Sequence, residues 1–251
     1  MEDKVRIFGV DIDNLTLDEI ADKTKRLVEE SNKSCTLIVA PNVEFIMKAQ
    51  KDKKFFDILK SAKLATPDSI GVTIAGKKQG KPFKERIPGQ SYLRKVFEVG
   101  EKEGWTFYLL GGEGDVPKRA KEHLESLYPN CKIVGCHEGF FVEDSEEKVI
   151  EEINSLKPNV LFVAMGAPRQ EKWIYDNRNK LKVDIAAGQG GTFDYEAGTV
   201  KRAPVWMQKC GIEWLWRLSQ DPKRIKRMVV LPIFLFKVLF TKDITKGKFS
   251  E

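Results

Sequence analysis

The stretch that decides the fold begins with the run Trp105-Thr106-Phe107-Tyr108-Leu109-Leu110 and continues into Gly111-Gly112-Glu113-Gly114-Asp115. The run is almost entirely apolar or aromatic, which is typical of a strand that is buried on both faces. Residues 116–127 then have a helical pattern, and residues 132–136 form a second apolar run. A strand, a glycine-rich turn, a helix and a further strand in this order predict a βαβ unit.

The same alternation of apolar strands and helices extends in both directions from this unit. Further strands are expected over residues 5–10, 35–40, 63–65, 160–165 and 183–187, and helices over residues 16–30, 43–62, 91–103, 145–156 and about 170–179. The first of these helices opens with a capping-box pattern, Thr16 followed three residues later by Glu19. The sequence therefore predicts an α/β fold, a Rossmann-like parallel sheet with helices on both faces.

The composition of the chain changes near residue 200. Trp206, Trp214 and Trp216 follow this point, and a cluster of lysines and arginines comes after them. We therefore predict a main α/β domain over residues 1–199 and a C-terminal helical appendage over residues 200–251.

The overall composition narrows the class of partner. The chain has 251 residues and a net charge of +6, with 41% hydrophobic and 32% charged residues. This balance favours a soluble protein with an anionic partner, which could be a nucleic acid, a nucleotide diphosphate or an anionic membrane. The cysteines and the two histidines lack zinc-like spacing, so no structural zinc site is expected. The first residues show no signal-peptide pattern, which indicates a cytoplasmic protein.

Asp68 is the first candidate for chemistry. It lies in the stretch Ala65-Thr66-Pro67-Asp68-Ser69-Ile70-Gly71, between a short apolar run and the next helical segment. A carboxylate there would lie where a strand ends at the mouth of a parallel sheet, which suits a general base. The alternative is that Asp68 only caps the helix that follows, one of the commonest uses of aspartate.

Three glycine turns follow expected strands: Gly111-Gly112, Gly166 and Gly188 to Gly191. In an open parallel sheet such turns share the edge at which ligands bind, and glycine lets a backbone approach phosphates closely. Together they predict a nucleotide site. None of them matches the G-x-G-x-x-G fingerprint, so the signature that would favour a dehydrogenase is missing, and no cofactor-specific pattern favours a methyltransferase.

Arginines are placed to neutralise a leaving diphosphate. Arg86 lies in the polar, irregular stretch 80–89, which we expect to be a mobile active-site loop, and Arg169 belongs to the Gly166 turn. Three further arginines, Arg217, Arg224 and Arg227, are spaced by seven and three residues and would lie on one side of a continuous helix. The alternative for these three is a solvated basic face.

Asp11-Ile12-Asp13 resembles the D-x-D pattern with which many sugar-nucleotide transferases hold a divalent metal. It lies in an expected strand-to-helix connection, and no further carboxylate or histidine pattern accompanies it. We therefore interpret both aspartates as solvated loop acids and expect no metal site.

Residues 228–240 form an apolar run in which Lys237 is the charged residue. The run is shorter than the about 20 residues that cross a membrane. Basic residues before it, followed by Phe234, Phe236 and Phe240, suit a segment that lies in the interface of an anionic bilayer. The alternatives are an ordinary buried terminal helix and a dimer contact.

A set of motifs runs in order along nearly the whole chain. They are Pro41-Asn42, Pro67-Asp68, Lys84 to Gly89, Leu109 to Gly112, Gly166 to Trp173, Gly190 to Asp194, Lys201 to Pro204 and Glu213 to Leu215. Together they resemble the WecG/TagA/CpsF family of bacterial glycosyltransferases. Within the family the chain most resembles the TagA branch, the wall teichoic acid N-acetylmannosaminyltransferases.

The resemblance implies an inverting transferase that moves N-acetylmannosamine from its UDP donor to the 4-hydroxyl of N-acetylglucosamine on undecaprenyl diphosphate. The product would be the β-1,4 disaccharide linkage unit of wall teichoic acid. The resemblance also implies a Rossmann-like core, an appendage that completes the active site and reaches the membrane, and no metal or other cofactor. One alternative is a related enzyme that uses another UDP-sugar, such as UDP-N-acetylmannosaminuronic acid, in polysaccharide assembly. The other is a non-enzymatic basic module that binds a membrane or nucleic acid.

Site residues are carried over by motif. Asp68 takes the place of the base, and Arg86 and Arg224 are the expected catalytic arginines. Asn42 and Gln170 are expected to line the pocket. The turns and the resemblance together add further substrate-binding candidates, namely Arg169, Gly111, Gly112, Gly190, Gly191, Asp194, Arg217 and Arg227.

Two positions depart from the family pattern. Ala40 stands where threonine is common, which removes a hydroxyl from the expected pocket, and Gln189 stands where an apolar residue is more usual. The expected partners are a UDP-sugar, a polyprenyl-diphosphate-linked acceptor, the anionic inner face of the cell membrane and a second copy of the chain. Nucleic acid is not an expected partner.

Overall fold

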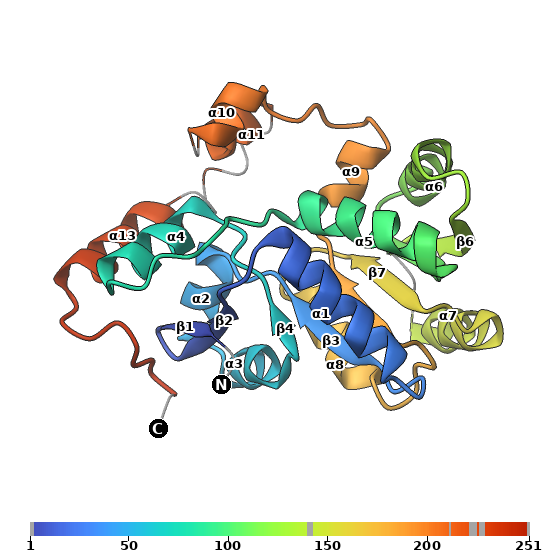
Figure 1. The fold of residues 1–251 in the computed structure, drawn as a ribbon, viewed down its shortest axis with the longest axis horizontal. Coiled ribbons are helices and arrows are strands. Elements are labelled where there is room, and N and C mark those ends of the chain that lie inside the picture. The colour runs from blue at the N-terminus through green and yellow to red at the C-terminus, as the bar shows by residue number, and fades with distance from the viewer. Residues whose placement is uncertain (1–2, 140–142, 211, 221–224, 226–228, 250–251) are drawn as a thin grey trace.

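A computed structural model of the chain describes residues 3–139, 143–210, 212–220, 225 and 229–249. These residues form a six-stranded parallel sheet between layers of helices (Figure 1). In spatial order the strands are β4 (Leu64–Ala65), β3 (Thr36–Val39), β8 (Ile185–Gly188), β7 (Val160–Ala164), β5 (Thr106–Gly111) and β6 (Lys132–His137). The predicted α/β fold with a parallel sheet is confirmed.

Alternate residues of each strand face two different cores. In β7, Leu161 and Val163 join one core, while Val160, Phe162 and Ala164 join the other. This explains why the central strands are apolar throughout, since side chains on both faces of the sheet are buried.

Helices cover both faces of the sheet. One layer holds α1 (Leu17–Glu29), α5 (Gly89–Glu103), α6 (Val116–Leu127) and α9 (Thr192–Glu196). The opposite layer holds α2 (Val43–Ala49), α3 (Lys53–Ser61), α7 (Glu143–Leu156) and α8 (Arg169–Asn177), with α4 (Ile70–Lys78) beside them. Beyond α9 come α10 (Val205–Lys209), α11 (Glu213–Gln220) and α13 (Val230–Phe240).

The expected strand over residues 5–10 is wrong, because the chain turns back within it. β1 (Lys4–Ile7) and β2 (Val10–Asp13) form an antiparallel hairpin around Phe8 and Gly9, which have φ angles of 46° and 81°. Turns of this kind match the twist of paired strands. The C-terminal segment holds this turn, since the amide of Phe8 donates to the carbonyl oxygen of Ile244 at 2.6 Å.

The hairpin also changes the interpretation of the D-x-D pattern. Asp11 and Asp13 lie in β2 and not in a solvated loop. The Asp11 carboxylate pairs with Arg6 across the hairpin at 2.6 Å. Asp13 is buried and accepts from Lys23 Nζ at 2.9 Å and from the amide of Ala65 at 2.8 Å. Both aspartates therefore hold the hairpin together and tie it to its neighbours.

The expected long helix over residues 43–62 is two helices. Asp52 ends the interruption by capping α3, where its side chain accepts from the amide of Phe55 at 3.0 Å. The capping box of α1 is confirmed, with both the Thr16 and the Glu19 side chains accepting backbone amides. Helical periodicity alone did not distinguish one helix from two with a cap between them.

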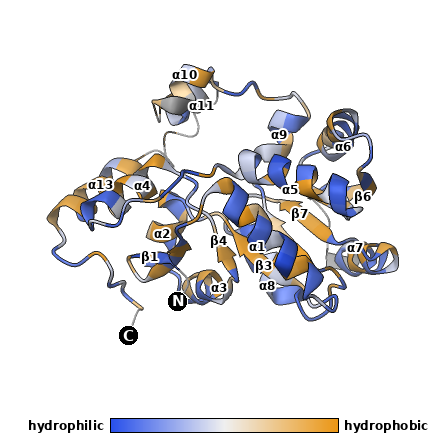
Figure 2. Ribbon diagram, in the orientation of Figure 1, coloured by the Kyte–Doolittle hydropathy of each residue, from blue (hydrophilic) through white to orange (hydrophobic). Residues whose placement is uncertain are grey.

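The last described helix, α13, packs against α2 and α4. Phe234 and Val238 are fully buried in the same core as the sheet, and the Phe234 ring meets the Phe8 ring edge-on at 5.8 Å. The opposite side of α13 is also apolar and exposed, with Phe236 at 62% and Phe240 at 71% (Figure 2). The buried-helix alternative is therefore correct for one side of α13 only. The division of the chain at residue 200 stays a prediction.

Among the helices that the structure describes, none combines the length and the apolar character needed to cross a membrane.

Candidate active site

A pocket of about 280 Å³ opens at the edge where the carboxyl ends of the strands meet. Its walls include residues that follow β3, β4, β7 and β8. From its carboxyl end β3 continues into α2 on one face of the sheet, whereas its neighbour β8 continues into α9 on the other face. The pocket therefore lies at a topological switch point, which is where open α/β sheets bind their ligands.

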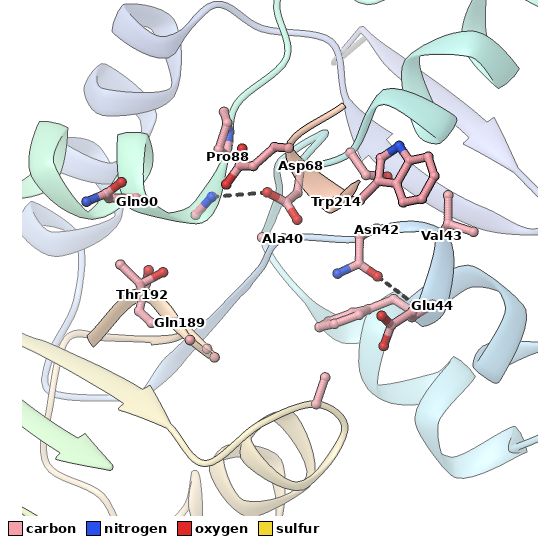
Figure 3. A pocket seen from close by; sticks show the side chains of 18 of the residues that line it. Ala40, Asn42, Val43, Glu44, Asp68, Pro88, Gln90, Gln189, Thr192 and Trp214 are labelled. Atoms are coloured by element: carbon pink, nitrogen blue, oxygen red, sulfur yellow. Dashed lines mark hydrogen bonds between the residues drawn. The ribbon is translucent and has the colours of Figure 1, made fainter. Parts of the chain in front are cut away.

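Asp68 lies in the wall of this pocket and is tied to a helix distant in sequence (Figure 3). Its Oδ1 accepts a hydrogen bond of 3.1 Å from the amide of Gly89, the first residue of α5. The N-cap of the helix that follows Asp68 is Ser69. Asp68 therefore does accept a hydrogen bond from the first turn of a helix, but the helix is α5 and not α4, which follows it in sequence. This bond leaves the Asp68 carboxylate in the pocket wall.

Arg86 lines the same pocket from the loop between α4 and α5. We expected this loop to be mobile, and the structure gives it several anchors. The amide of Lys84 donates to Asn14 Oδ1, Glu85 Oε2 accepts from the amide of Leu17, and the amide of Ile87 donates to the carbonyl oxygen of Pro67, each at 2.8 Å. These contacts anchor the loop that brings Arg86 to the wall of the pocket.

Asn42 and Ala40 enter the pocket from the end of β3. Asn42 is the N-cap of α2, and its Oδ1 accepts from the amide of Phe45 at 3.1 Å. This bond fixes the orientation of the amide and turns its nitrogen away from the helix (Figure 3). Ala40 also lines the pocket.

Gln170 lines the pocket as expected, yet its side chain is used within the protein. Its Oε1 accepts from the amides of Gly166 at 3.1 Å and Gly190 at 3.0 Å, which belong to the turns after β7 and β8. Its Nε2 donates to Glu171 Oε1 at 2.6 Å. Glu171 is 1% exposed, and burial raises its pKa to about 7.

The remaining expected residues divide into those near the pocket and those elsewhere. Gly190 and Gly191 line it, whereas Gly111, Gly112, Arg169 and Asp194 are not part of its lining. A Cβ at Gly111 would lie 2.4 Å from the carbonyl oxygen of Ala164, so close packing of β5 on β7 already accounts for this glycine. For these four residues a role in binding stays a prediction.

The basic residues of the tail are only partly covered by the structure. Arg217 lies in α11, and its side chain is not described. Arg224 and Arg227 lie outside the described residues. The tail does reach the pocket through other side chains, Arg202, Glu213, Trp214 and Leu231. The tail thus contacts the pocket directly, through residues that were not among the expected site residues, although Arg202, Glu213 and Trp214 lie in the motifs quoted for the resemblance.

Other lining residues were also missed, among them Gln90, Thr192 and Tyr195. Gln90 is 7% exposed, and its Nε2 donates to Glu196 Oε1 at 2.7 Å. Glu196 in turn accepts two hydrogen bonds of 3.0 Å from Arg94. The polar residues Gln90 and Arg94, one turn apart at the start of α5, were a signal for this buried contact, but its partner is more than 100 residues away.

In the part of the chain that the structure describes, no group of three or more His, Cys, Asp or Glu side chains is arranged to hold a metal ion.

Comparison with known proteins places these features in a family. The model of the "Glycosyl transferase WecG/TagA/CpsF family" matches residues 5–248. Relatives from Staphylococcus aureus strains MW2 and NCTC 8325 are each 31% identical over 246 residues, which is 98% of this chain and 96% of the relative. Both are named N-acetylglucosaminyldiphosphoundecaprenol N-acetyl-beta-D-mannosaminyltransferase. The chain, with its pocket at the switch point of a parallel sheet, belongs to the WecG/TagA/CpsF family of glycosyltransferases.

Proposed function

We propose that the protein transfers N-acetylmannosamine from UDP-N-acetylmannosamine to the 4-hydroxyl of N-acetylglucosamine carried on undecaprenyl diphosphate. The match over nearly the whole length of both chains supports this reaction, because the relatives carry its name. The linkage formed is β, so the configuration at the transferred sugar inverts in a single displacement.

The observation that carries the proposal is the position of Asp68. Its carboxylate lies in the wall of a pocket whose other walls include the glycine turns at Gly166 and Gly190. A single-step inversion needs a base beside the acceptor hydroxyl and charge stabilisation at the leaving group on the far side of the sugar. Asp68 supplies the base. The glycines of the turns after β7 and β8 let the nucleotide diphosphate approach the backbone closely, while their Gly166 and Gly190 N–H groups are bound to Gln170.

Arginine neutralises the leaving diphosphate in this mechanism. Arg86 lines the pocket, and it is the arginine in the lining that the sequence analysis expected for this task. We assign the same task to Arg224, which lies outside the described residues, because the neighbouring helix α11 already brings Glu213 and Trp214 to the pocket.

The mechanism uses no metal. The D-x-D aspartates are not available for one, because Asp11 pairs with Arg6 and Asp13 is buried against Lys23 and the amide of Ala65. Two guanidinium groups supply the positive charge that a divalent ion supplies in other sugar-nucleotide transferases.

The acceptor is a lipid, and we propose that α13 brings the enzyme to it. Ile233, Phe236, Leu239 and Phe240 are between 46% and 71% exposed on one side of this helix. An apolar helix face of this kind suits the interface of an anionic bilayer, here the inner face of the cell membrane. A second copy of the chain is the other occupant that would cover this face, as a homo-oligomer in exchange with a membrane-bound monomer.

The test is turnover of UDP-N-acetylmannosamine with a short-chain lipid-diphosphate N-acetylglucosamine acceptor, with and without EDTA. We expect UDP release and a β-1,4-linked disaccharide in both conditions. UDP-N-acetylmannosaminuronic acid and UDP-N-acetylglucosamine serve as matched donors, and preference for either of them would refute the donor assignment. Activity that disappears in EDTA would refute the metal-free mechanism.

A further inference from the structure

Gln170 joins the two glycine turns of the pocket from below. The turn after β7 contains Gly166 and the turn after β8 contains Gly190, and both glycines line the pocket with positive φ angles of 77° and 51°. One oxygen, Gln170 Oε1, accepts the backbone N–H groups of both turns at 3.1 and 3.0 Å. The spacing between the turns therefore depends on which atom of the Gln170 amide faces them.

Glu171 and the two backbone N–H groups together determine that orientation. A glutamine amide rotated by half a turn would place NH₂ against two N–H donors, which cannot hydrogen-bond to it. The Glu171 Oε1 atom accepts from Gln170 Nε2 at 2.6 Å and so holds the amide oxygen toward the turns. Both side chains are buried, at 2% and 1% exposure, so water does not replace either bond readily.

Gly188, at the end of β8, makes room for this pair. A Cβ at this position would lie 2.4 Å from both Gln170 Nε2 and Glu171 Oε1. Any side chain at position 188 would therefore displace the hydrogen bond between Gln170 and Glu171. The end of β8 at Gly188, the Gln170 amide and the Glu171 carboxyl group therefore pack closely against one another.

The chemistry of Glu171 does not indicate a stabilising ion pair. Its second oxygen, Oε2, has no hydrogen-bond partner among the described residues. Burial raises its pKa to about 7, so the neutral acid is present at neutral pH. Either form offers Oε1 as an acceptor, which is the property that Gln170 uses.

We propose that Glu171 is a positioning residue that acts through Gln170 to set the spacing of the Gly166 and Gly190 turns. It touches no substrate in this role. Loss of the acceptor at position 171 removes one of the three hydrogen bonds that hold the Gln170 amide, so the shared partner of the two turns is held less firmly. The consequence for UDP binding rests on the proposed function, whereas the consequence for the two turns does not.

The first measurement is backbone hydrogen exchange in the ligand-free, full-length protein. We expect Glu171→Leu to speed exchange at the Gly166 and Gly190 amides by about tenfold, as release from a closed state predicts. Exchange along the rest of α8 should stay unchanged. Equal acceleration along the whole of α8 would show a general packing role and overturn the proposal. Asp176→Asn, an exposed carboxylate on the same helix, is the matched control and should change neither turn.

The second measurement separates binding from chemistry. In Glu171→Leu we expect the Kd for UDP and the KM for the UDP-sugar to rise about tenfold, the effect of one lost buried hydrogen bond. The KM for the lipid acceptor and kcat should stay within about threefold, which identifies lost ground-state binding. Glu171→Gln keeps a carbonyl oxygen at this position and should restore wild-type values.

A swap of the two residues keeps the proposal falsifiable if Glu171→Leu does not fold. Gln170→Glu places two carboxyl groups against each other and should weaken UDP binding about tenfold or more. Adding Glu171→Gln to it restores a donor and an acceptor in exchanged positions, so binding should recover to within about threefold. Equal losses in Gln170→Glu and the double variant would overturn the proposal. An inactive wild-type enzyme with normal exchange behaviour would instead refute the proposed function alone.

Discussion

Replacement of Asp68 by asparagine separates the two tasks of this side chain. Asparagine keeps an oxygen that can accept from the amide of Gly89, where the bond is now 3.1 Å, but it cannot take up a proton. Removal of a general base typically lowers the rate 10²- to 10⁴-fold, which is about 3 to 5 kcal/mol of transition-state stabilisation. We expect Asp68→Asn to lose kcat by this amount and to keep its affinity for UDP.

Asp68→Ala serves as the control for the structural task. It removes the base and also the hydrogen bond to the start of α5, which costs about 1 kcal/mol, the usual value for a lost helix cap. In a chain of this length that change lowers the melting temperature by about 2 to 4 °C. Asp68→Asn should melt with the wild-type protein, and Asp68→Ala should melt below both.

Initial rates of UDP release at saturating acceptor measure kcat, and calorimetric titration measures UDP binding. The reasoning about the base is refuted if Asp68→Asn retains kcat within about threefold of the wild-type value. The reasoning about the cap is refuted if the two variants share one melting temperature.

Three further predictions concern the tail and the buried carboxyl group. Phe234→Ala should lower the free energy of unfolding by about 3 to 5 kcal/mol in urea titrations, because this fully buried ring joins α13 to the core; a loss below about 1 kcal/mol would contradict the docking of α13. Phe236→Glu with Leu239→Glu should leave that free energy within about 0.5 kcal/mol, since both side chains are 62% exposed. The same double variant should abolish flotation with anionic liposomes, and unchanged flotation would exclude this face as the membrane contact. Glu171, with its pKa raised from 4.5 to about 7, holds its proton more tightly in the folded state. Its contribution to the free energy of unfolding is complete below about pH 4.5 and is lost as the pH rises through 7. The free energy of unfolding should therefore fall by about 3 kcal/mol across this window relative to Glu171→Gln. Parallel pH profiles for the two proteins would contradict the burial of a titrating carboxyl group.

The fold followed from sequence wherever the signal was local. Apolar runs separated by helical periodicity predicted the parallel sheet, and α6 begins and ends at the expected residues, Val116 and Leu127. The errors lie where two elements of similar pattern meet. The turn of the β1–β2 hairpin is itself apolar, so Val5 to Val10 resembles one continuous strand. The α2–α3 break has helical periodicity on both sides, so the pattern did not reveal either boundary.

The candidate site was predictable only in part. Asp68, Arg86, Asn42, Gln170, Gly190 and Gly191 were expected from motifs and do line one pocket. Motif positions did not indicate that Gln170 would be committed to two backbone amides, because those donors lie in turns that follow different strands. The same limit applies to Gln90, whose partner Glu196 is 106 residues away.

Apart from the β1–β2 hairpin and the division between α2 and α3, the sequence by itself determined the order of the sheet strands and their helices, the glycine turns at the strand ends and the position of a carboxylate beside them. These features depend on neighbours within a few residues, and local pattern encodes them. Only the tertiary structure decided which of these segments lie together in the pocket. It joined Asp68 to the start of α5, brought Trp214 and Leu231 of the tail to the pocket, and placed Glu171 beneath two turns. Such contacts depend on the order of strands in the sheet and on close packing between distant segments, and no local pattern carries that information.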